Sequence, residues 1–160
     1  MGERSGAMGT FPPSEIAEGS EARKLARGIC RTLRALGYGA LTEFTLRSGR
    51  RVDVIGLNAA GEFLIVEVKI SEADFRADRK WPDYLEFCDG FYFAVPEGFP
   101  QRLLPEECGL MVVDAYMGAI LRPSPKLPPM AAARRRALTL SFGLAATGRL
   151  HRVIDPGAAL

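Results

Sequence analysis

Two acidic residues and a lysine in the first half of the chain have the types and spacing of a metal-dependent hydrolytic centre. Asp53 lies in GRRVDVIGL, and Glu67 and Lys69 lie further on in IVEVKI. Two close carboxylates repel each other unless a proton or a cation lies between them. Mg²⁺ prefers oxygen ligands and accepts substrate phosphate oxygens, and a neighbouring lysine can activate an attacking water. The residues predict phosphodiester hydrolysis with Mg²⁺, or Mn²⁺ in its place, held by Asp53, Glu67 and the carbonyl of Val68.

Other catalytic chemistries have little material in this sequence. The only histidine is His151, and the three cysteines, Cys30, Cys88 and Cys108, are widely spaced and form no CxxC pair. Ser-His-Asp or Cys-His catalysis, zinc clusters and a disulfide framework are therefore not expected.

Strand alternation assigns the three residues to one face of a sheet. Strands are expected at residues 41–47, 51–57 and 62–70, separated by Ser-Gly and Asn-Ala-Ala-Gly turns. Because side chains alternate, Glu67 and Lys69 share a face. A three-residue hairpin loop with Gly61 in the left-handed conformation places Asp53 opposite Glu67, with Cβ atoms about 4.5 to 5.5 Å apart. A two-residue loop would put the two acids on different faces.

Helical segments surround this meander. An amphipathic helix is expected from Ser20, its N-cap, to residue 36, with Gly37 as its stop. The opposite face carries a basic stripe that is either a solvated surface or a phosphate-binding one; its residues are Arg23, Lys24, Arg27, Arg31 and Arg34. Residues 74–88 are expected to be helical with an interruption at Pro82. Strands at 91–95 and 110–115, an extended crossing at 122–129 and a basic helix at 130–148 follow. The order α-β-β-β-α-β predicts an α/β fold with a mixed sheet flanked by helices.

Length and composition favour one soluble domain. The chain has 160 residues, 48% of them hydrophobic and 25% charged, with a formal charge of +2. No apolar run reaches the 18 or more residues of a membrane span, and the start lacks a signal peptide core, so a cytoplasmic protein is expected. Residues 1–13 are predicted to be disordered, 14–125 to form the domain, and 126–160 to be a Pro-rich crossing and basic helical extension of that domain.

The motifs resemble a known family. Asp53 and Glu67-Val68-Lys69 are similar to the signature of the PD-(D/E)XK nuclease superfamily, with Val52 in place of its usual Pro. LARG, GRRVDVIGL and IVEVKISEADFRADRKWPDYLEFCDGFYFAV more closely resemble the MmcB family of bacterial DNA-repair proteins. The resemblance covers about residues 20–125. It implies a restriction-endonuclease-like core and a role in DNA repair.

The resemblance also suggests further site residues. The superfamily often adds one more acid, for which Glu18, Glu21 and Glu43 are candidates. Lys80 and Tyr84 resemble in placement the Gln-x-x-x-Tyr element of some members of this superfamily. They are either contacts to a scissile phosphate or, because Pro82 lies between them, a solvated Lys and a packing Tyr. Trp81 is either a base-stacking residue or a packing residue.

The function expected from these observations is a metal-dependent DNA endonuclease or nuclease-like repair factor. Its partners would be DNA, including single-stranded or damaged DNA, and other repair proteins, with no membrane. The candidate DNA contacts are Arg27, Arg31, Arg51, Lys80 and Tyr84. The alternatives are a non-catalytic DNA-binding module and a scaffold in a repair complex, both retaining the nuclease fold.

Overall fold

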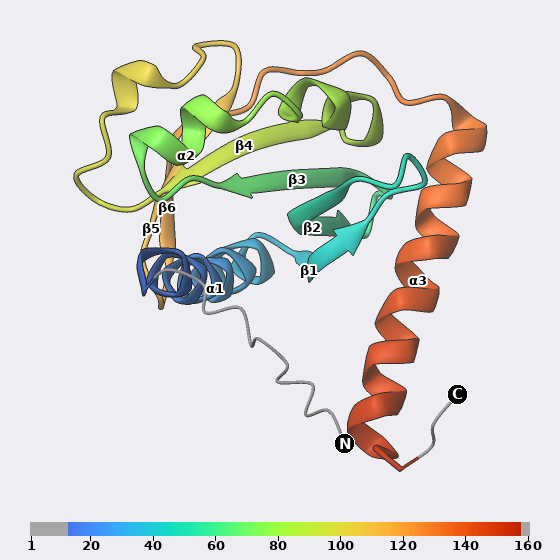
Figure 1. Cartoon of the computed structure of the whole chain (residues 1–160). Coiled ribbons are helices and arrows are strands. Elements are labelled where there is room, and N and C mark those ends of the chain that lie inside the picture. Colours follow the sequence, from blue (N-terminus) through green and yellow to red (C-terminus); the bar gives the residue numbers. More distant parts are fainter. Residues whose placement is uncertain (1–12, 158–160) are drawn as a thin grey trace, which may run out of the picture.

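The computed structural model describes residues 13–157, with side chains from residue 19 onward. Six strands form one sheet in chain order, and helices lie on both of its faces (Figure 1). The strands are β1 (Tyr38–Thr45), β2 (Arg51–Asn58), β3 (Phe63–Val68), β4 (Gly90–Val95), β5 (Gly109–Val113) and β6 (Gly118–Arg122). The α-helices are α1 (Pro13–Ala35), α2 (Glu72–Ala77) and α3 (Ala132–Ile154), with short 3₁₀ helices η1 (Trp81–Phe87) and η2 (Gln101–Leu103).

The sheet is mixed, as the sequence predicts. β1, β2 and β3 form an antiparallel meander, β4 and β5 run parallel to β3, and β6 returns antiparallel to β5. The α-β-β-β-α-β order is confirmed through β4, and the following strand β5 also lies where it is expected. β6 is an additional edge strand that was not predicted.

The hairpin between β2 and β3 has the predicted loop. Val54 pairs with Val66 and Leu57 with Phe63, which leaves three residues between Asn58 and Glu62. Gly61 adopts φ +79°, the left-handed conformation that such a loop requires of its last residue. The Asn58 side-chain oxygen accepts from the backbone N–H groups of Ala60 and Glu62 at 3.0 and 2.9 Å. The register that places Asp53 opposite Glu67 is therefore confirmed.

The two faces of the sheet carry different cores. The apolar side of α1 packs on the face that holds Val54, Val66 and Val68. The other face carries Ile55, Ile65 and an aromatic cluster under η1 and α3, and alternation with Val66 and Val68 directs Glu67 to this face as well. Asp53, also expected on this face, contributes instead to a hollow that α1 lines. Trp81 stacks on Phe91 and meets Phe93 edge-on, with ring centroids 5.7 and 5.6 Å apart. The packing interpretation of Trp81 is the one that this geometry favours.

Several helix boundaries differ from the sequence expectation. α1 begins at Pro13, so Ser20 lies within the helix and is not its N-cap. Proline suits the first helical position because its missing N–H has no partner there in any case. The remainder of the stretch predicted to be disordered, residues 1–12, lies outside the described residues. Gly37, with φ +88°, follows the helix end as predicted.

The later helices also differ in part from the boundaries that the local sequence signals predict. Helix α3 continues through Gly148 to Ile154, because one glycine within a helix costs only about 1 kcal/mol. The segment around Pro82 is interrupted as expected. Helix α2 ends at Ala77, and Pro82 lies in the first turn of η1, where its lack of an N–H does no harm.

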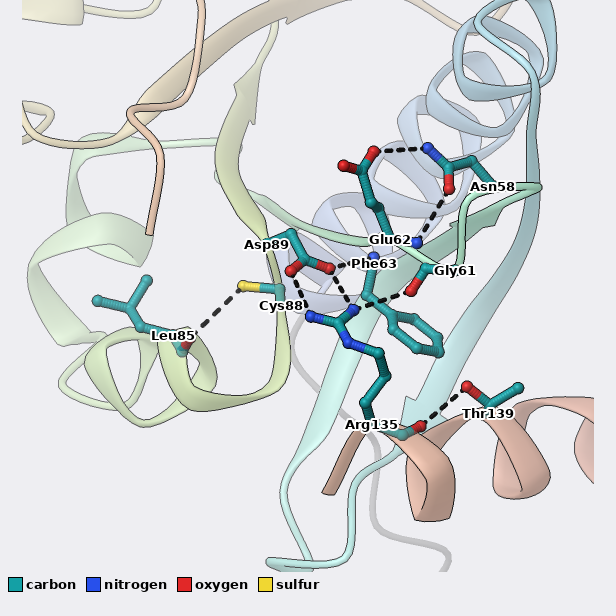
Figure 2. Close-up of polar contacts among 9 residues, drawn as sticks. All are labelled: Asn58, Gly61, Glu62, Phe63, Leu85, Cys88, Asp89, Arg135 and Thr139. Atoms are coloured by element: carbon teal, nitrogen blue, oxygen red, sulfur yellow. Dashed lines mark hydrogen bonds and ion pairs between the residues drawn. The ribbon is translucent and has the colours of Figure 1, made fainter. Parts of the chain in front are cut away.

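An ion pair fixes α3 to the sheet (Figure 2). Arg135 donates to both carboxylate oxygens of Asp89 at 2.8 and 2.7 Å and to the carbonyl of Gly61 at 2.8 Å. Asp89 also accepts the backbone N–H of Phe63 at 2.7 Å. Leu138 and Phe142 are buried beside this pair and join the aromatic core. The first half of α3 is thereby held across the end of the β2–β3 hairpin.

Candidate metal centre

The strand pair β2–β3 separates where the two acids face each other. Backbone pairing ends at Val54 and Val66, and side chains replace the next ladder bonds. Asp53 donates its backbone N–H to Oε1 of Glu67 at 3.0 Å, and Val68 donates its N–H to Oδ2 of Asp53 at 2.8 Å. Each carboxylate therefore reaches across to the opposite backbone. The two acids lie together at one point of the sheet, as the register predicts.

Both carboxyl groups resist ionisation in this position. Burial, followed by the charge of Asp53, raises the pKa of Glu67 from 4.5 to about 8, and the N–H of Asp53 and the charge of Lys69 only partly oppose this. Burial also raises the pKa of Asp53, against the lowering effect of the Val68 N–H. A proton on Glu67 thus relieves the repulsion at neutral pH, as two close acids require when no cation compensates them.

Lys69 follows β3 and lies in an acidic enclosure. Its ammonium is 2.8 Å from Oδ2 of Asp78 and 4.0 Å from Oδ1 of Asp74, and its side chain is 8% exposed. Burial lowers the pKa of Lys69, but the Asp78 hydrogen bond and the charges of Asp74, Asp78 and Glu67 together raise it above its ordinary value. Lys69 is therefore a fixed ammonium.

Sequence reasoning missed the two partners of Lys69. The Asp74 carboxylate accepts a hydrogen bond from the backbone N–H of Ile70 at 3.1 Å. The backbone N–H of Asp74 in turn donates to the hydroxyl of Ser71, the N-cap of α2, at 3.1 Å. Asp78 ends α2 and accepts the N–H of Lys80 at 2.7 Å. The sequence does contain a signal for these partners, namely acidic residues in and just after a short helix that follows the Glu-x-Lys motif. Their contact with Lys69 depends on a turn of the chain at Asp78, and this turn exists only because α2 ends before that residue.

A hollow of about 690 Å³ opens beside Asp53, between α1 and the first strands, and Glu43 also lines it. Asp53 and Val68 contribute to its wall, and cations from both sides line it. The cations are Arg23, Lys24 and Arg27 of α1 and Arg51 of β2. An anion that enters this hollow meets a basic wall next to Asp53.

Glu43, one of the candidate additional acids, lies on β1 opposite Asp53. Thr42 pairs with Val54 and Phe44 with Val52, so Glu43 occupies the position across from Asp53. Its φ of +48° is the only positive φ among the described non-glycine residues, and such strain is often found at functional positions. Its carboxylate lies 3.9 Å from Arg51, and its carbonyl accepts a hydrogen bond from Arg149 at 3.1 Å.

The other predicted site residues are dispersed. Arg31 lies over the ring of Tyr116, 5.8 Å from its centroid, and away from the hollow. Lys80 is exposed at the start of η1, while Tyr84 is buried and donates to the carbonyl of Arg51 at 3.4 Å. Burial and the charge of Glu67 raise the pKa of Tyr84 to about 12. Lys80 and Tyr84 therefore belong to one short 3₁₀ segment, Lys80 as its N-cap and Tyr84 within it, but one side chain is exposed and the other buried.

Of the remaining acid candidates, Glu21 is partly buried on α1 but does not line the hollow. The side chain of Glu18 lies outside the described residues. Among the described residues, no group of three or more His, Cys, Asp or Glu side chains is arranged to hold a metal.

The donor set nevertheless fits a magnesium ion. Mg²⁺ is typically held by one or two carboxylates, keeps several waters and takes substrate phosphate oxygens as further ligands. Asp53 and Glu67 supply two carboxylates whose pKa values burial raises, and a bound cation would offset this cost. The N–H and C=O of a strand residue point to the same neighbouring strand, so the carbonyl of Val68 faces Asp53 as its N–H does.

Comparison with known proteins places the chain in a family. The family described as "DNA repair protein MmcB-like" matches residues 11–157. The chain belongs to the MmcB-like family of DNA repair proteins. This family assignment was predicted from the residues around Asp53 and Glu67, and it is confirmed.

A solved structure is similar over most of its length. It is the "SPO1766 protein of unknown function from Silicibacter pomeroyi", with 45% identity and a TM-score of 0.83, covering 88% of this chain and 95% of that one. No curated protein matches the chain. Within the part of the chain that the structure describes, none of the helices is both long and apolar enough to span a bilayer.

Proposed function

We propose that this MmcB-like protein is a Mg²⁺-dependent nuclease with a PD-(D/E)XK core that hydrolyses phosphodiester bonds in DNA. The observation that carries the proposal is the separation of β2 from β3 at Asp53 and Glu67. The two carboxylates replace ladder bonds there, beside a hollow lined by cations. A purely structural pair of acids would not explain why one of the two, Asp53, lies in a wall that is otherwise rich in cations.

Each residue has a distinct task in this proposal. Asp53, Glu67 and the carbonyl of Val68 hold Mg²⁺, which when bound polarises a phosphate oxygen and favours deprotonation of a water. Lys69 opposes the negative charge that develops on the scissile phosphate. Arg27 and Arg51 bind backbone phosphates on either side of the hollow, which gives affinity without sequence readout. Water attacks phosphorus, and the bond to the leaving sugar oxygen breaks.

A non-catalytic DNA-binding function is the second candidate, and one observation favours it. Asp78 holds the ammonium of Lys69 at 2.8 Å, and this ion pair reduces the charge that Lys69 can offer to a phosphate. Under this alternative, the basic hollow would bind DNA and the acids would only modulate that binding.

Cleavage of a panel of single-stranded, duplex, flap and abasic DNA with Mg²⁺ or Mn²⁺ separates the two functions. We expect wild type to cleave at least one substrate, and Asp53→Asn and Glu67→Gln to lose cleavage while keeping DNA binding. Glu97→Gln, at an exposed acid that does not line the hollow, is the matched control. Binding without cleavage of any substrate by wild type would favour the DNA-binding function.

A further inference from the structure

The outward face of α3 is apolar, although no described element covers it. Five large apolar side chains of α3 are more than half exposed, and four of them lie on this face, namely Leu140 at 60%, Leu144 at 75%, Leu150 at 57% and Ile154 at 72%. Figure 1 shows the second half of α3 extending away from the sheet. Exposed apolar groups grouped on one element mark interaction sites more often than isolated ones do.

The spacing of these residues is symmetric about Thr147. From Leu140 the steps are four residues to Leu144, three to Thr147, three to Leu150 and four to Ile154. All five lie on one side of the helix because steps of three and four follow the helical period. We call these five residues the α3 stripe. Because the spacing is the same in both directions along the helix, the stripe is complementary to a second copy of itself that runs antiparallel.

The residues at its centre suit such close contact. The hydroxyl of Thr147 donates within its own helix, to the carbonyl of Gly143 at 2.9 Å, so its methyl group can face a partner without an unsatisfied polar atom. A side chain at Gly143 would meet nothing within 4 Å in this chain. A glycine within a helix lowers helix stability by about 1 kcal/mol relative to alanine. Close approach of a second helix would explain why a glycine is found at this position.

Charge selects the direction of the partner helix. Helix α3 contains no acidic residue, so a parallel copy would align Arg136 with its own equivalent. In the antiparallel arrangement centred on Thr147, the partner's Asp155 lies opposite Thr139. That position is three residues, or about 4.5 Å along the axis, from Arg136. The negative end of each helix dipole then lies near the basic start of the other helix.

From this self-complementarity we infer that the protein forms a two-fold symmetric dimer in which the α3 stripes of two copies pack antiparallel across Thr147. The interface is isologous, as in most dimers. Leu140 packs against the partner's Ile154, and Leu144 packs against the partner's Leu150. Each copy covers the protruding end of the other helix. The inference concerns assembly and does not depend on metal binding or cleavage.

Sedimentation velocity of the full chain over about 1 to 200 μM tests the dimer. We expect a concentration-dependent dimer whose dissociation constant rises at least about 30-fold in Leu144→Glu, the effect of losing an interface hot spot. Val153→Glu, at an exposed residue of the same helix outside the stripe, should change it less than about threefold. Because both positions are exposed, neither variant should affect folding. A wild type that stays monomeric throughout, or equal effects of both variants, would overturn the inference.

Cysteine crosslinking tests the symmetry. Only a residue on the two-fold axis meets its own copy, so oxidised Thr147→Cys should form a disulfide-linked dimer, whereas Leu140→Cys should not. Arg136→Glu and Asp155→Arg should each weaken the dimer, and the double variant should restore it. A dimer that dissociates in Leu121→Glu, on the exposed edge strand β6, while tolerating Leu144→Glu would assign the interface to β6 and refute the α3 stripe.

Discussion

Glu67→Gln should remove most of the pH dependence of stability between pH 5 and pH 8. Glutamine keeps the acceptor oxygen that receives the Asp53 N–H and resembles the protonated glutamic acid in shape. It cannot ionise. The variant therefore copies the state that the folded wild type prefers at neutral pH.

The sign and size follow from the pKa of Glu67. The pKa rises from 4.5 to about 8 on folding, so between these values the native state binds more protons than the unfolded state, and stability falls as pH rises. Each pKa unit corresponds to about 1.4 kcal/mol, which gives a loss of roughly 3 to 4 kcal/mol from pH 5 to pH 8. That is a large part of the 5 to 15 kcal/mol typical of a domain.

The assay is urea unfolding at half-unit steps from pH 5 to pH 8 in EDTA. The window avoids Asp78, because the Lys69 ion pair outweighs burial and lowers the pKa of Asp78, so its contribution is complete above pH 5. It also avoids the thiols, whose ordinary pKa of 9.0 is raised by burial. Glu97→Gln should retain the wild-type slope. A flat wild-type profile, or an equal slope in Glu67→Gln, would refute the reasoning.

The same preparations test metal binding without an activity measurement. Mg²⁺ competes with the proton on Glu67, so millimolar Mg²⁺ should stabilise the wild type more at pH 8 than at pH 5. Glu67→Gln should lose most of this effect. Equal stabilisation of both proteins would mean that the ion binds elsewhere.

Three further outcomes are expected. Lys69→Ala should lower single-turnover cleavage about 10² to 10³-fold, measured at a temperature where the variant is still folded because it leaves the buried Asp78 without its partner, and undiminished cleavage would remove the lysine from the mechanism. Arg27→Glu should weaken DNA binding in fluorescence anisotropy and reduce the salt slope by about 0.7 to 0.9 per lost contact, whereas Arg34→Glu, outside the hollow, should do so less. Arg135→Ala should lower the free energy of unfolding by about 1 to 3 kcal/mol because it leaves Asp89 without its partner, with exposed Arg102→Ala as the control.

The features that could be predicted from the sequence depend on short-range rules. The β2–β3 register follows from a loop whose last residue, Gly61, must adopt a positive φ. Strand alternation then assigns Glu67 and Lys69 to one face. The position of the acids relative to each other was therefore accessible without any tertiary information.

The features that could not be predicted depend on contacts between distant segments. The ion pair of Arg135 with Asp89 joins residues 46 apart in the chain and decides where α3 lies. Lys69 meets Asp78 only because α2 ends at Ala77, before Pro82. The edge strand β6 has five residues and little alternation in burial, so its sequence carries almost no period-2 signal.

Helix α3 connects the two proposals physically. Arg149, on its inner side, donates to the carbonyl of Glu43, the strained residue across the strand from Asp53. A positive φ at a non-glycine residue costs of order 1 to 3 kcal/mol and persists only where the surroundings enforce it. The helix whose outer stripe we propose to form the dimer thus also contacts the backbone of Glu43.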